Sequence, residues 1–356
     1  MQNQGLEGRR RVGTIGHEGQ TLNPVVATMR ALVQDRYGSP DVLRVAHVPA
    51  PTPGAGQVRV RVAAASVNAR DWHVMRGEPR LARVLDRTTF SRTAPRVSIR
   101  GTDFAGVVDA VGAGVTRWQP GDRVFGEADG AIANYVVAQS DGVAAAPEGI
   151  GFEEAAAMPL AANTALMCLR AGEPHPGDRV LVNGASGGVG TFILQLAKAK
   201  GMHVTGVCSA RNAQLASSLG ADVIIDYALR DFCAGPDRYD VVVDLVGNRS
   251  LRDLRGAVRP TGTLVLSGGG TSGAGRFLGP LSLLMRAQLI ARLPGPRIVT
   301  PQAEPSRQSL EELATCVSSG AVTPVIDRTF SFDDAAEAIR YLEVEHARAK
   351  VVITID

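Results

Sequence analysis

The sequence predicts an α/β protein built from a compact, irregular antiparallel β-barrel and a doubly wound parallel sheet. A chain of 356 residues is longer than one hydrophobic core usually fills, so we expect two domains. Short β-like runs broken by Gly and Pro occupy the first part of the chain, whereas strands and helices alternate from about Glu153 onward. A hydrophobic content of 45% and a charged content of 21% are typical of a folded globular protein.

The first 28 residues differ from the rest of the chain. They are rich in Gly and polar residues, contain the triplet Arg9–Arg11, and show no sustained period of 2 or 3.6 residues. We therefore predict that residues 1–28 form a disordered extension, with Met29 as an alternative beginning of the protein. A targeting function is a weaker interpretation, because no apolar run follows the arginines.

The barrel is predicted for residues 29–155 together with residues 321–356. Residues 58–68, VRVRVAAASVN, begin with strict alternation of apolar and polar side chains, as in a half-buried strand. Residues 80–96 have the composition of a basic helical insertion.

The C-terminal segment returns to the same pattern. Ser309 and Glu312 form an S-x-x-E capping box, which predicts a helix that runs to Gly320. Residues 323–330 and 350–355 then have the composition of strands.

Five near-continuous apolar runs predict the parallel sheet, within residues 156–320. Strands that are buried on both faces have this composition. The runs are residues 179–183, 203–208, 222–226, 240–246 and 262–267. Helical stretches separate them, and two of these end at Gly201 and Gly220, which suit the left-handed position after a helix. Strands joined by crossover helices make a doubly wound sheet.

A glycine-rich loop follows the first of these strands and opens a helix. It matches the dinucleotide-binding pattern G-x-G-x-x-G, with Ala185 in place of the first glycine. Gly187 would let the backbone approach a pyrophosphate, and Gly190 would let the helix pack closely on the strand. Free N–H groups at the helix N-terminus favour an anion. We predict that residues Ser186, Gly187, Gly188, Val189 and Gly190 bind the cofactor.

The end of the second strand bears on which nucleotide binds. NAD-specific sites usually have an acid there, which accepts hydrogen bonds from the ribose 2′-OH. This chain instead has Ser209 and Arg211, which can donate to a 2′-phosphate. The sequence therefore predicts NADPH rather than NADH. The alternative is that Ser209 caps the helix and Arg211 is a solvated residue of its first turn.

Composition excludes several other classes of protein. A net charge of +3, with arginines spread along the chain, gives no nucleic-acid-binding surface. Four cysteines without a C-x-x-C motif, and the lack of a secretory apolar region, predict a cytoplasmic protein. The most apolar segment, residues 277–293, contains Pro280, Arg286 and Arg292, so we expect no membrane span and no membrane contact. The wider segment of residues 270–300 would cover the substrate cleft or a subunit interface, with ordinary packing as the alternative and docking to a membrane surface as a weaker one. We expect a homodimer.

Three segments together resemble the medium-chain dehydrogenase/reductase superfamily. They are residues 63–77 (AAASVNARDWHVMRG), residues 101–126 (GTDFAGVVDAVGAGVTRWQPGDRVFG), and the loop GASGGVG with residues 219–227 (LGADVIIDY). The resemblance runs from Met29 to the C-terminus. It implies a GroES-like catalytic domain and a Rossmann domain that binds the nucleotide.

The sequence departs from the zinc-containing members at the positions of their zinc ligands. Asn68, Thr102 and Leu160 stand where those members have Cys, His and a third ligand. Asn, Thr and Leu cannot form the shell of thiolates and imidazole that a catalytic zinc needs. We therefore predict no metal site. The chain resembles the zinc-independent branch, which includes quinone oxidoreductases, zeta-crystallin, and enoyl and enone reductases.

The resemblance also implies functions for single residues. Asn68 and Thr164 match residues beside the nicotinamide and, with Asp71, are the predicted catalytic residues. Further cofactor contacts are predicted at Tyr227, Val246, Gly247, Ser267 and Lys350. Structural alternatives remain open: Asn68 could cap a turn, Asp71 could anchor its loop, Thr164 could be an ordinary helix residue, Tyr227 could simply pack, and Lys350 could be a surface charge.

A conjugated acceptor suits a site without a Lewis acid, because it spreads the incoming charge over an enolate. The sequence thus predicts an NADPH-dependent reductase of a small electrophile, either a quinone or an α,β-unsaturated carbonyl compound. Two alternatives are a non-catalytic NADPH-binding sensor or adaptor, and an NAD(P)-dependent alcohol dehydrogenase without metal. No Tyr lies near Asn68 as a proton donor, and His73 beside Trp72 is more typical of a structural residue. Solvent, or the cofactor ribose through water, is the predicted proton source.

Overall fold

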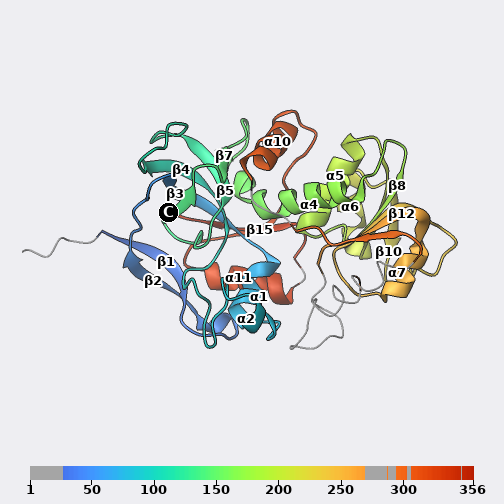
Figure 1. Cartoon of the computed structure of the whole chain (residues 1–356), viewed down its shortest axis with the longest axis horizontal. Helices are drawn as coiled ribbons and strands as arrows, with labels where there is room; N and C mark the ends of the chain where they lie inside the picture. Colours follow the sequence, from blue (N-terminus) through green and yellow to red (C-terminus); the bar gives the residue numbers. More distant parts are fainter. Residues whose placement is uncertain (1–26, 269–286, 288–293, 303–305, 346) are drawn as a thin grey trace, which may run out of the picture.

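The fold consists of two main β-sheets with helices packed between and around them (Figure 1). The computed structural model describes residues 27–268, 287, 294–302, 306–345 and 347–356. Helix α4 (Pro159–Gly172) lies between the two sheets, preceded by the short helix α3 (Phe152–Ala156). Their buried side chains share one core with strands of both sheets, including Phe125 of the first and Val243 of the second.

The first sheet has seven strands, joined mostly in antiparallel pairs. Its order is β14-β15-β3-β4-β5-β7, and β6 also pairs with β3. The bounds are β3 (Gln57–Val67), β4 (Asp103–Val111), β5 (Arg123–Glu127), β6 (Tyr135–Gln139), β7 (Val143–Ala145), β14 (Ile326–Phe330) and β15 (Lys350–Thr354). The alternation that predicted a strand at residues 58–68 matches β3, and the C-terminal strand β15 pairs directly with it. This pairing brings the end of the chain beside Val67.

Smaller elements flank this sheet. Strands β1 (Thr28–Gln34) and β2 (Leu43–Pro49) form an antiparallel pair. The connection between them contains the 3-10 turn η1 (Pro40–Val42). Helix α1 (Ala69–Arg76) follows β3 and packs near α11 (Ala335–Val344). Strand β1 begins one residue inside the segment predicted to be disordered, while residues 1–26 lie outside the described residues.

The second sheet has six parallel strands in the order β10-β9-β8-β11-β12-β13. They are β8 (Arg179–Asn183), β9 (His203–Cys208), β10 (Val223–Asp226), β11 (Tyr239–Asp244), β12 (Val258–Leu266) and β13 (Arg297–Val299). This is the strand order of a Rossmann sheet. Successive strands are added on one side of β8 as far as β10, and on its other side from β11 onward. The predicted α/β fold class, a barrel-like sheet plus a doubly wound sheet, is confirmed.

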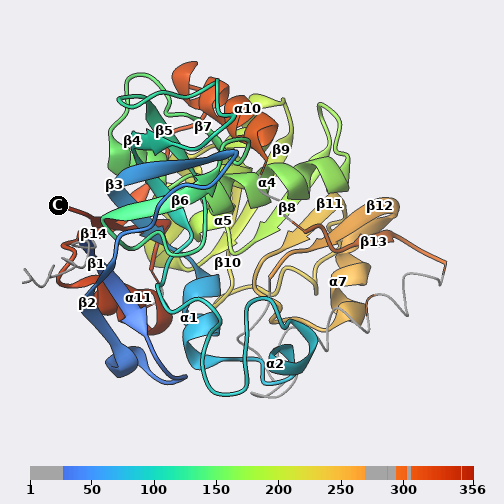
Figure 2. The ribbon, with the colours of Figure 1, turned by 60° about the vertical axis from the view of Figure 1, so that its left-hand side comes forward.

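Alternating side chains cover both faces of the second sheet. Val180 and Val182 of β8 pack in a core with α4 and α5 (Gly188–Ala199), whereas Leu181 between them packs in a core with α7 (Leu251–Ala257). Figure 2 shows the strands of this sheet side by side, with α7 beside β12. Burial on both faces explains the continuous apolar runs of these strands. The connection after β9 contains the 3-10 turn η2 (Ala210–Asn212) and α6 (Ala213–Ser218).

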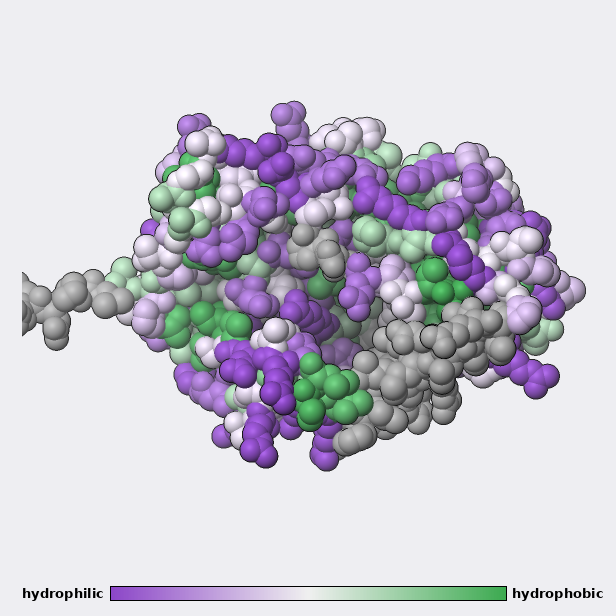
Figure 3. Space-filling view, viewed as in Figure 1, coloured by the Kyte–Doolittle hydropathy of each residue, from purple (hydrophilic) through white to green (hydrophobic). Residues whose placement is uncertain are grey.

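Some local predictions were wrong. Residues 80–96 form only a four-residue helix, α2 (Ala82–Leu85), followed by turns; its Val84 and Leu85 are exposed, and Figure 3 shows apolar surface in this region. The helix predicted to be capped by Ser309 is α10 (Arg307–Ser318), whose cap is Ser306. The Ser306 hydroxyl accepts a hydrogen bond from the Ser309 amide, because the helix begins three residues earlier than the sequence pattern indicated.

Among the described residues, no helix is long and apolar enough to cross a membrane. The apolar segment at residues 277–293 lies outside the described residues except for Ala287, which is buried.

Candidate active site

Asn68 lies at the turn between β3 and α1. Its backbone is extended and it is the residue before the first turn of α1. The backbone N–H of Asn68 donates to Asp71 Oδ2 at 2.7 Å, and the backbone N–H of Asp71 donates back to the backbone carbonyl of Asn68 at 2.9 Å. Asp71 therefore anchors the turn through a backbone amide, which was the alternative to a substrate contact. Burial raises the pKa of Asp71 to about 6.

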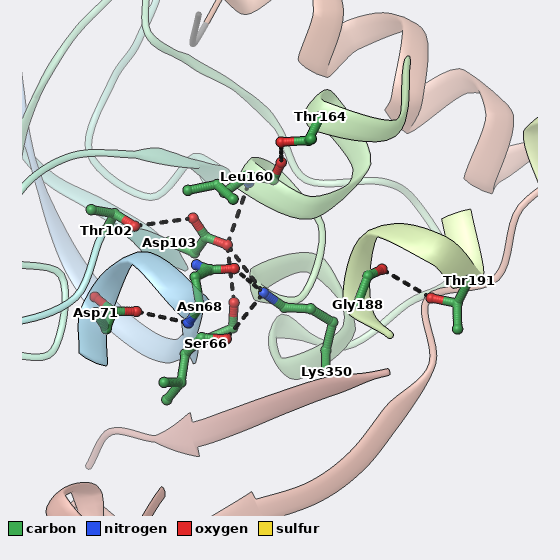
Figure 4. A network of polar contacts seen from close by, with 11 residues as sticks. Ser66, Asn68, Asp71, Thr102, Asp103, Leu160, Thr164, Gly188, Thr191 and Lys350 are labelled. Atoms are coloured by element: carbon green, nitrogen blue, oxygen red, sulfur yellow. Dashed lines mark hydrogen bonds and ion pairs between the residues drawn. The ribbon is translucent and has the colours of Figure 1, made fainter. Parts of the chain in front are cut away.

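Lys350 reaches Asn68 from the opposite end of the sequence. It is the first residue of β15, and the pairing of β15 with β3 sets Val351 opposite Val67. The Lys350 ammonium donates to Asn68 Oδ1 at 2.5 Å and to the Val67 carbonyl at 3.3 Å. Both side chains are buried, and Figure 4 shows them directed toward each other. Lys350 is therefore not the surface charge that was one alternative for it.

Asp103, the first residue of β4, completes this group. Its carboxylate Oδ2 lies 3.6 Å from Lys350 Nζ and accepts from the Ser66 hydroxyl at 3.0 Å. The Leu160 amide, at the start of α4, points to the same oxygen at 3.4 Å. The Asp103 side chain is fully buried, so the pair with Lys350 is shielded from solvent. Helix α4, β3, β4 and β15 thus meet at one buried polar cluster (Figure 4).

One atom of this cluster has no partner among the described residues. The side-chain Oδ1 of Asn68 accepts a hydrogen bond from Lys350, while its Nδ2 is buried and makes no hydrogen bond to any described residue. A buried donor without an acceptor costs roughly 1–3 kcal/mol. Such a group is typical of a site where a ligand supplies the missing acceptor.

Glu127 adds a second carboxyl beside Asp103. The two residues are directly opposite each other in the β4–β5 ladder, so their side chains share one face. Glu127 Oε1 is buried without a hydrogen bond in the described part of the chain. Burial and the charge of Asp103 raise the pKa of Glu127 to about 8. Neither Glu127 nor Asp103 was among the predicted site residues, because their proximity follows from strand register rather than from local spacing.

The glycine-rich loop adopts the turn that the sequence predicted, with one shift. The left-handed residue is Gly184, at φ 91°, so Ala185 does not need a positive φ. Ala185 is fully buried under the loop. A Cβ at Gly190 would lie 2.2 Å from the Gly184 carbonyl oxygen, which explains the glycine there. The loop leads directly into α5, whose first N–H groups remain available for an anion.

The C-terminal segment crosses this loop. Ala349 donates its N–H to the Ser186 carbonyl at 2.8 Å, with a positive φ of 56° that is unusual for a residue with a side chain. A Cβ at Gly188 would lie 3.0 Å from Lys350 Cδ. The absence of a side chain at Gly188 therefore makes room for the stem of Lys350. Val189, next along α5, is partly buried against the core.

The residues predicted for the 2′-phosphate follow β9, and Tyr227, another predicted cofactor contact, follows β10. Ser209 is the residue before η2, and its side chain makes no capping hydrogen bond. Arg211 is exposed within η2, and Tyr227, 52% exposed, follows β10. Asn212, which the sequence analysis missed, donates to the Ser186 hydroxyl at 2.9 Å and so ties this turn to the glycine-rich loop.

The remaining predicted cofactor residues follow β11 and β12. The amides of Val246 and Gly247 both donate to Asp244 Oδ1 at 3.1 Å. Ser267 donates its N–H to the Asp244 carbonyl at 3.0 Å. These residues lie at the carboxyl edge of the sheet, where ligands of doubly wound folds bind.

Two other candidates have local partners. The Thr164 hydroxyl donates to the Leu160 carbonyl one turn earlier in α4, at 2.7 Å. His73 stacks on Trp72, and burial lowers its pKa. Its Nδ1 is buried without a hydrogen bond among the described residues, and its nearest acidic influence is Glu343 of α11 rather than the Lys350 cluster.

Comparison with known proteins identifies the family. Residues 54–148 match the alcohol dehydrogenase GroES-like domain, and residues 219–353 match the zinc-binding dehydrogenase family. A 2-methylene-furan-3-one reductase of Solanum lycopersicum is 33% identical, over 94% of this chain and 81% of the relative. The chain belongs to the medium-chain dehydrogenase/reductase superfamily.

Two further relatives place it in the branch of quinone oxidoreductases and enone reductases. The chloroplastic NADPH-dependent alkenal/one oxidoreductase of Arabidopsis thaliana is 31% identical, over 91% of this chain and 79% of the relative. The structure of the quinone oxidoreductase from Coxiella burnetii has a TM-score of 0.81 and 31% identity, covering 93% of this chain and all of that one. The protein is thus an oxidoreductase of this superfamily, with a GroES-like part and a Rossmann part that binds NAD(P).

The name of the zinc-binding dehydrogenase family raises the question of a metal, and the donor set does not fit one. Asn68 Oδ1 is held by an ammonium, Thr102 points its hydroxyl toward Asp103 at 3.4 Å, and Leu160 offers no side-chain donor. The Lys350 ammonium also lies beside the nearby carboxylate, where it would repel a cation. Within the described ranges, no group of three or more His, Cys, Asp or Glu residues could hold a metal ion.

Proposed function

We propose that this protein is an NADPH-dependent reductase of quinones or of activated C=C bonds in α,β-unsaturated carbonyl compounds. The observation that carries the proposal is the buried Nδ2 of Asn68, which has no hydrogen-bond partner in the described part of the chain and belongs to a cluster that adjoins the glycine-rich loop through Lys350 and Gly188. The names of the relatives, an enone reductase, an alkenal/one oxidoreductase and a quinone oxidoreductase, support the same class of substrate.

The residues present fit a dinucleotide cofactor. Gly187, Gly188 and Gly190 keep the loop free of side chains, and α5 begins there with unpaired N–H groups. Ser209 and Arg211 offer donors for a 2′-phosphate, and no acid stands among residues 209–212 to repel it. Tyr227, Val246, Gly247 and Ser267 would border the cofactor along the carboxyl edge of the sheet. When bound, reduced nicotinamide would supply the hydride.

Asn68 would act on the carbonyl oxygen of the substrate. Its Nδ2–H donates a hydrogen bond to the oxygen that gains negative charge as the β-carbon accepts hydride. A conjugated acceptor already spreads that charge, so a neutral donor suffices where a simple ketone would need a stronger electrophile. Thr164, whose hydroxyl proton is used within α4, can only accept a hydrogen bond from a ligand there.

The proton that completes the reduction would come from solvent. The Asn68 side-chain amide has no readily transferable proton. The His73 ring is not part of the Lys350 cluster, and the acidic side chain that affects its pKa is Glu343. Asp71 lines a small pocket with Arg100 and Thr102, and its pKa of about 6 leaves it mostly ionised at neutral pH. A water molecule in such a pocket is a reasonable route for the proton.

A direct test follows the loss of NADPH absorbance at 340 nm with a panel of quinones, enones and simple ketones. We expect turnover with quinones or enones and none with simple ketones. Asn68→Ala should lower kcat about tenfold or more, since a single donor to a developing oxyanion contributes on this order or above. NADPH binding, followed by its fluorescence, should change much less.

Two outcomes would contradict the proposal. Clear NADPH binding without turnover of any acceptor would favour a non-catalytic sensor or adaptor. Unchanged turnover of both substrate classes by the Asn68→Ala variant would remove Asn68 from the catalytic residues. A homodimer and a cytoplasmic location remain predictions, which size-exclusion chromatography with light scattering and cell fractionation would check.

A further inference from the structure

Lys350 occupies an unusual position, because its side chain connects the glycine-rich loop with Asn68. We propose that Lys350 is a positioning residue that holds the Asn68 amide with its oxygen inward and its Nδ2 toward the reacting carbonyl. The inference rests on the proposed function, since it concerns how the same donor is aimed. It differs from the cofactor contact that the family resemblance implied for Lys350.

The hydrogen bond between Lys350 and Asn68 can run in only one direction. An ammonium group donates and cannot accept, so it can face only the oxygen of a side-chain amide. Lys350 Nζ lies 2.5 Å from Asn68 Oδ1. Turning the amide over would set its Nδ2 donor against the ammonium, two donors face to face. Lys350 therefore selects one of two otherwise similar orientations of the Asn68 side chain.

The Lys350 ammonium is engaged by groups of the protein itself. A lysine ammonium has three protons. Three acceptors surround Nζ: Asn68 Oδ1, the Val67 carbonyl at 3.3 Å and Asp103 Oδ2 at 3.6 Å. The ammonium therefore makes two hydrogen bonds within the protein, and its charge is paired with the Asp103 carboxylate. The direct action of Lys350 is on Asn68.

The path of the Lys350 side chain is fixed by its neighbours. Ala349 has a φ of 56°, and its N–H is bonded to the Ser186 carbonyl at 2.8 Å, which fixes the start of β15 on the loop. The Lys350 stem then passes Gly188, where a Cβ would lie 3.0 Å from Lys350 Cδ. A side chain that is held at both ends loses little further freedom when it positions Asn68.

Burial and the surrounding charges act on Lys350 in opposite directions. Burial lowers the pKa of Lys350, and the nearby carboxyls of Asp103, Asp71 and Glu127 raise it in opposition. Arg100, also buried, interacts electrostatically with Asp71. Removing the lysine charge alone would leave Asp103 buried without its cation, which is destabilising. The test must therefore separate positioning from folding.

The experiment compares Lys350→Met, Asn68→Ala and the double variant, with Lys200→Met as the matched control because Lys200 is an exposed lysine. We expect Lys350→Met to lower kcat at least tenfold with an enone, while KM and the Kd for NADPH, from fluorescence titration, change less than threefold. If Lys350 acts through Asn68, adding Lys350→Met to Asn68→Ala should lower kcat by less than twofold. Lys200→Met should leave all three constants unchanged.

A second variant distinguishes a loss of positioning from a loss of stability. Lys350→Met combined with Asp103→Asn removes both charges of the buried pair and keeps an oxygen for Ser66 and Leu160. It should recover thermal stability relative to Lys350→Met, and its kcat should stay low. Recovery of kcat together with stability would show that Lys350 is only structural and would overturn the inference.

Other outcomes are equally decisive. A loss of NADPH affinity of tenfold or more in Lys350→Met would make the lysine a cofactor ligand. Independent, multiplying losses in the double variant would also refute an action through Asn68. Failure of the proposed function is distinguishable from these, because the unaltered protein would then reduce neither quinones nor enones.

Discussion

Glu127→Gln should stabilise the protein increasingly as the pH rises. The carboxyl lies opposite Asp103 in the β4–β5 ladder, and its Oε1 is buried without a partner among the described residues. Glutamine has nearly the same shape but carries no charge. The substitution therefore removes the cost of ionising this group in a buried, acidic environment and leaves its packing almost unchanged.

The magnitude follows from the pKa. Burial and Asp103 raise the pKa of Glu127 from 4.5 to about 8, so the folded protein binds this proton more tightly than the unfolded chain. Below pH 4.5 both states are protonated and the group costs nothing. Between about pH 4.5 and 8 stability falls by about 1.4 kcal/mol per pH unit, to a loss on the order of 5 kcal/mol above pH 8. At pH 7 the loss is roughly 3 kcal/mol.

The assay is thermal unfolding of both proteins from pH 5 to pH 9. The melting temperature of Glu127→Gln should exceed that of the parent by little at pH 5. At pH 7 the difference should be on the order of 6–12 °C, at roughly 2–4 °C per kcal/mol for domains of 150–250 residues. Glu148→Gln, at an exposed glutamate, is the matched control and should follow the parent at every pH. Parallel pH profiles for Glu127→Gln and the parent would refute the reasoning.

Two further predictions concern the cofactor loop and its neighbours. Arg211→Ala should weaken NADPH binding about tenfold and leave NADH within twofold, because a charge-assisted hydrogen bond to a 2′-phosphate contributes roughly 1.5–3 kcal/mol; equal losses for the two nucleotides in a fluorescence titration would contradict it. Ala349→Gly should raise stability by roughly 0.5–1 kcal/mol, since Ala349 has a φ of 56° that glycine adopts without a steric cost, and a lower melting temperature would count against this explanation.

Local patterns predicted most of the fold. The runs at residues 179–183 and 203–208 coincide with β8 and β9, because strands buried on both faces leave no polar positions in the sequence. The errors arose where local signals were weak or duplicated. Both Ser306 and Ser309 have side chains that can cap a helix, and the structure uses Ser306, whose hydroxyl accepts from the Ser309 amide. Strand β13 is only three residues long and has no pattern of its own.

The sequence predicted those parts of the candidate site whose residues lie close together in the chain. The glycine-rich loop and the turn from Asn68 to Asp71 each lie within a few consecutive residues, where one motif fixes the geometry. The contact between Lys350 and Asn68 spans 282 positions in the sequence. Only the pairing of β15 with β3 brings the two together, and nothing in either segment encodes that register by itself. The same reason kept Glu127 from being recognised beside Asp103.

The arrangement of Lys350 also bears on which substrates the site can reduce. Its positive charge lies close to Asn68, but the ammonium donates to Asn68 Oδ1 and the Val67 carbonyl and is paired with the Asp103 carboxylate. A substrate oxygen would therefore meet the amide Nδ2 of Asn68, polarised by the lysine through one hydrogen bond, rather than the cation itself. An enolate or a reduced quinone oxygen, whose charge is delocalised, needs less stabilisation from such a donor than a localised alkoxide does. The preference for conjugated acceptors then follows from how the protons of one buried lysine are used.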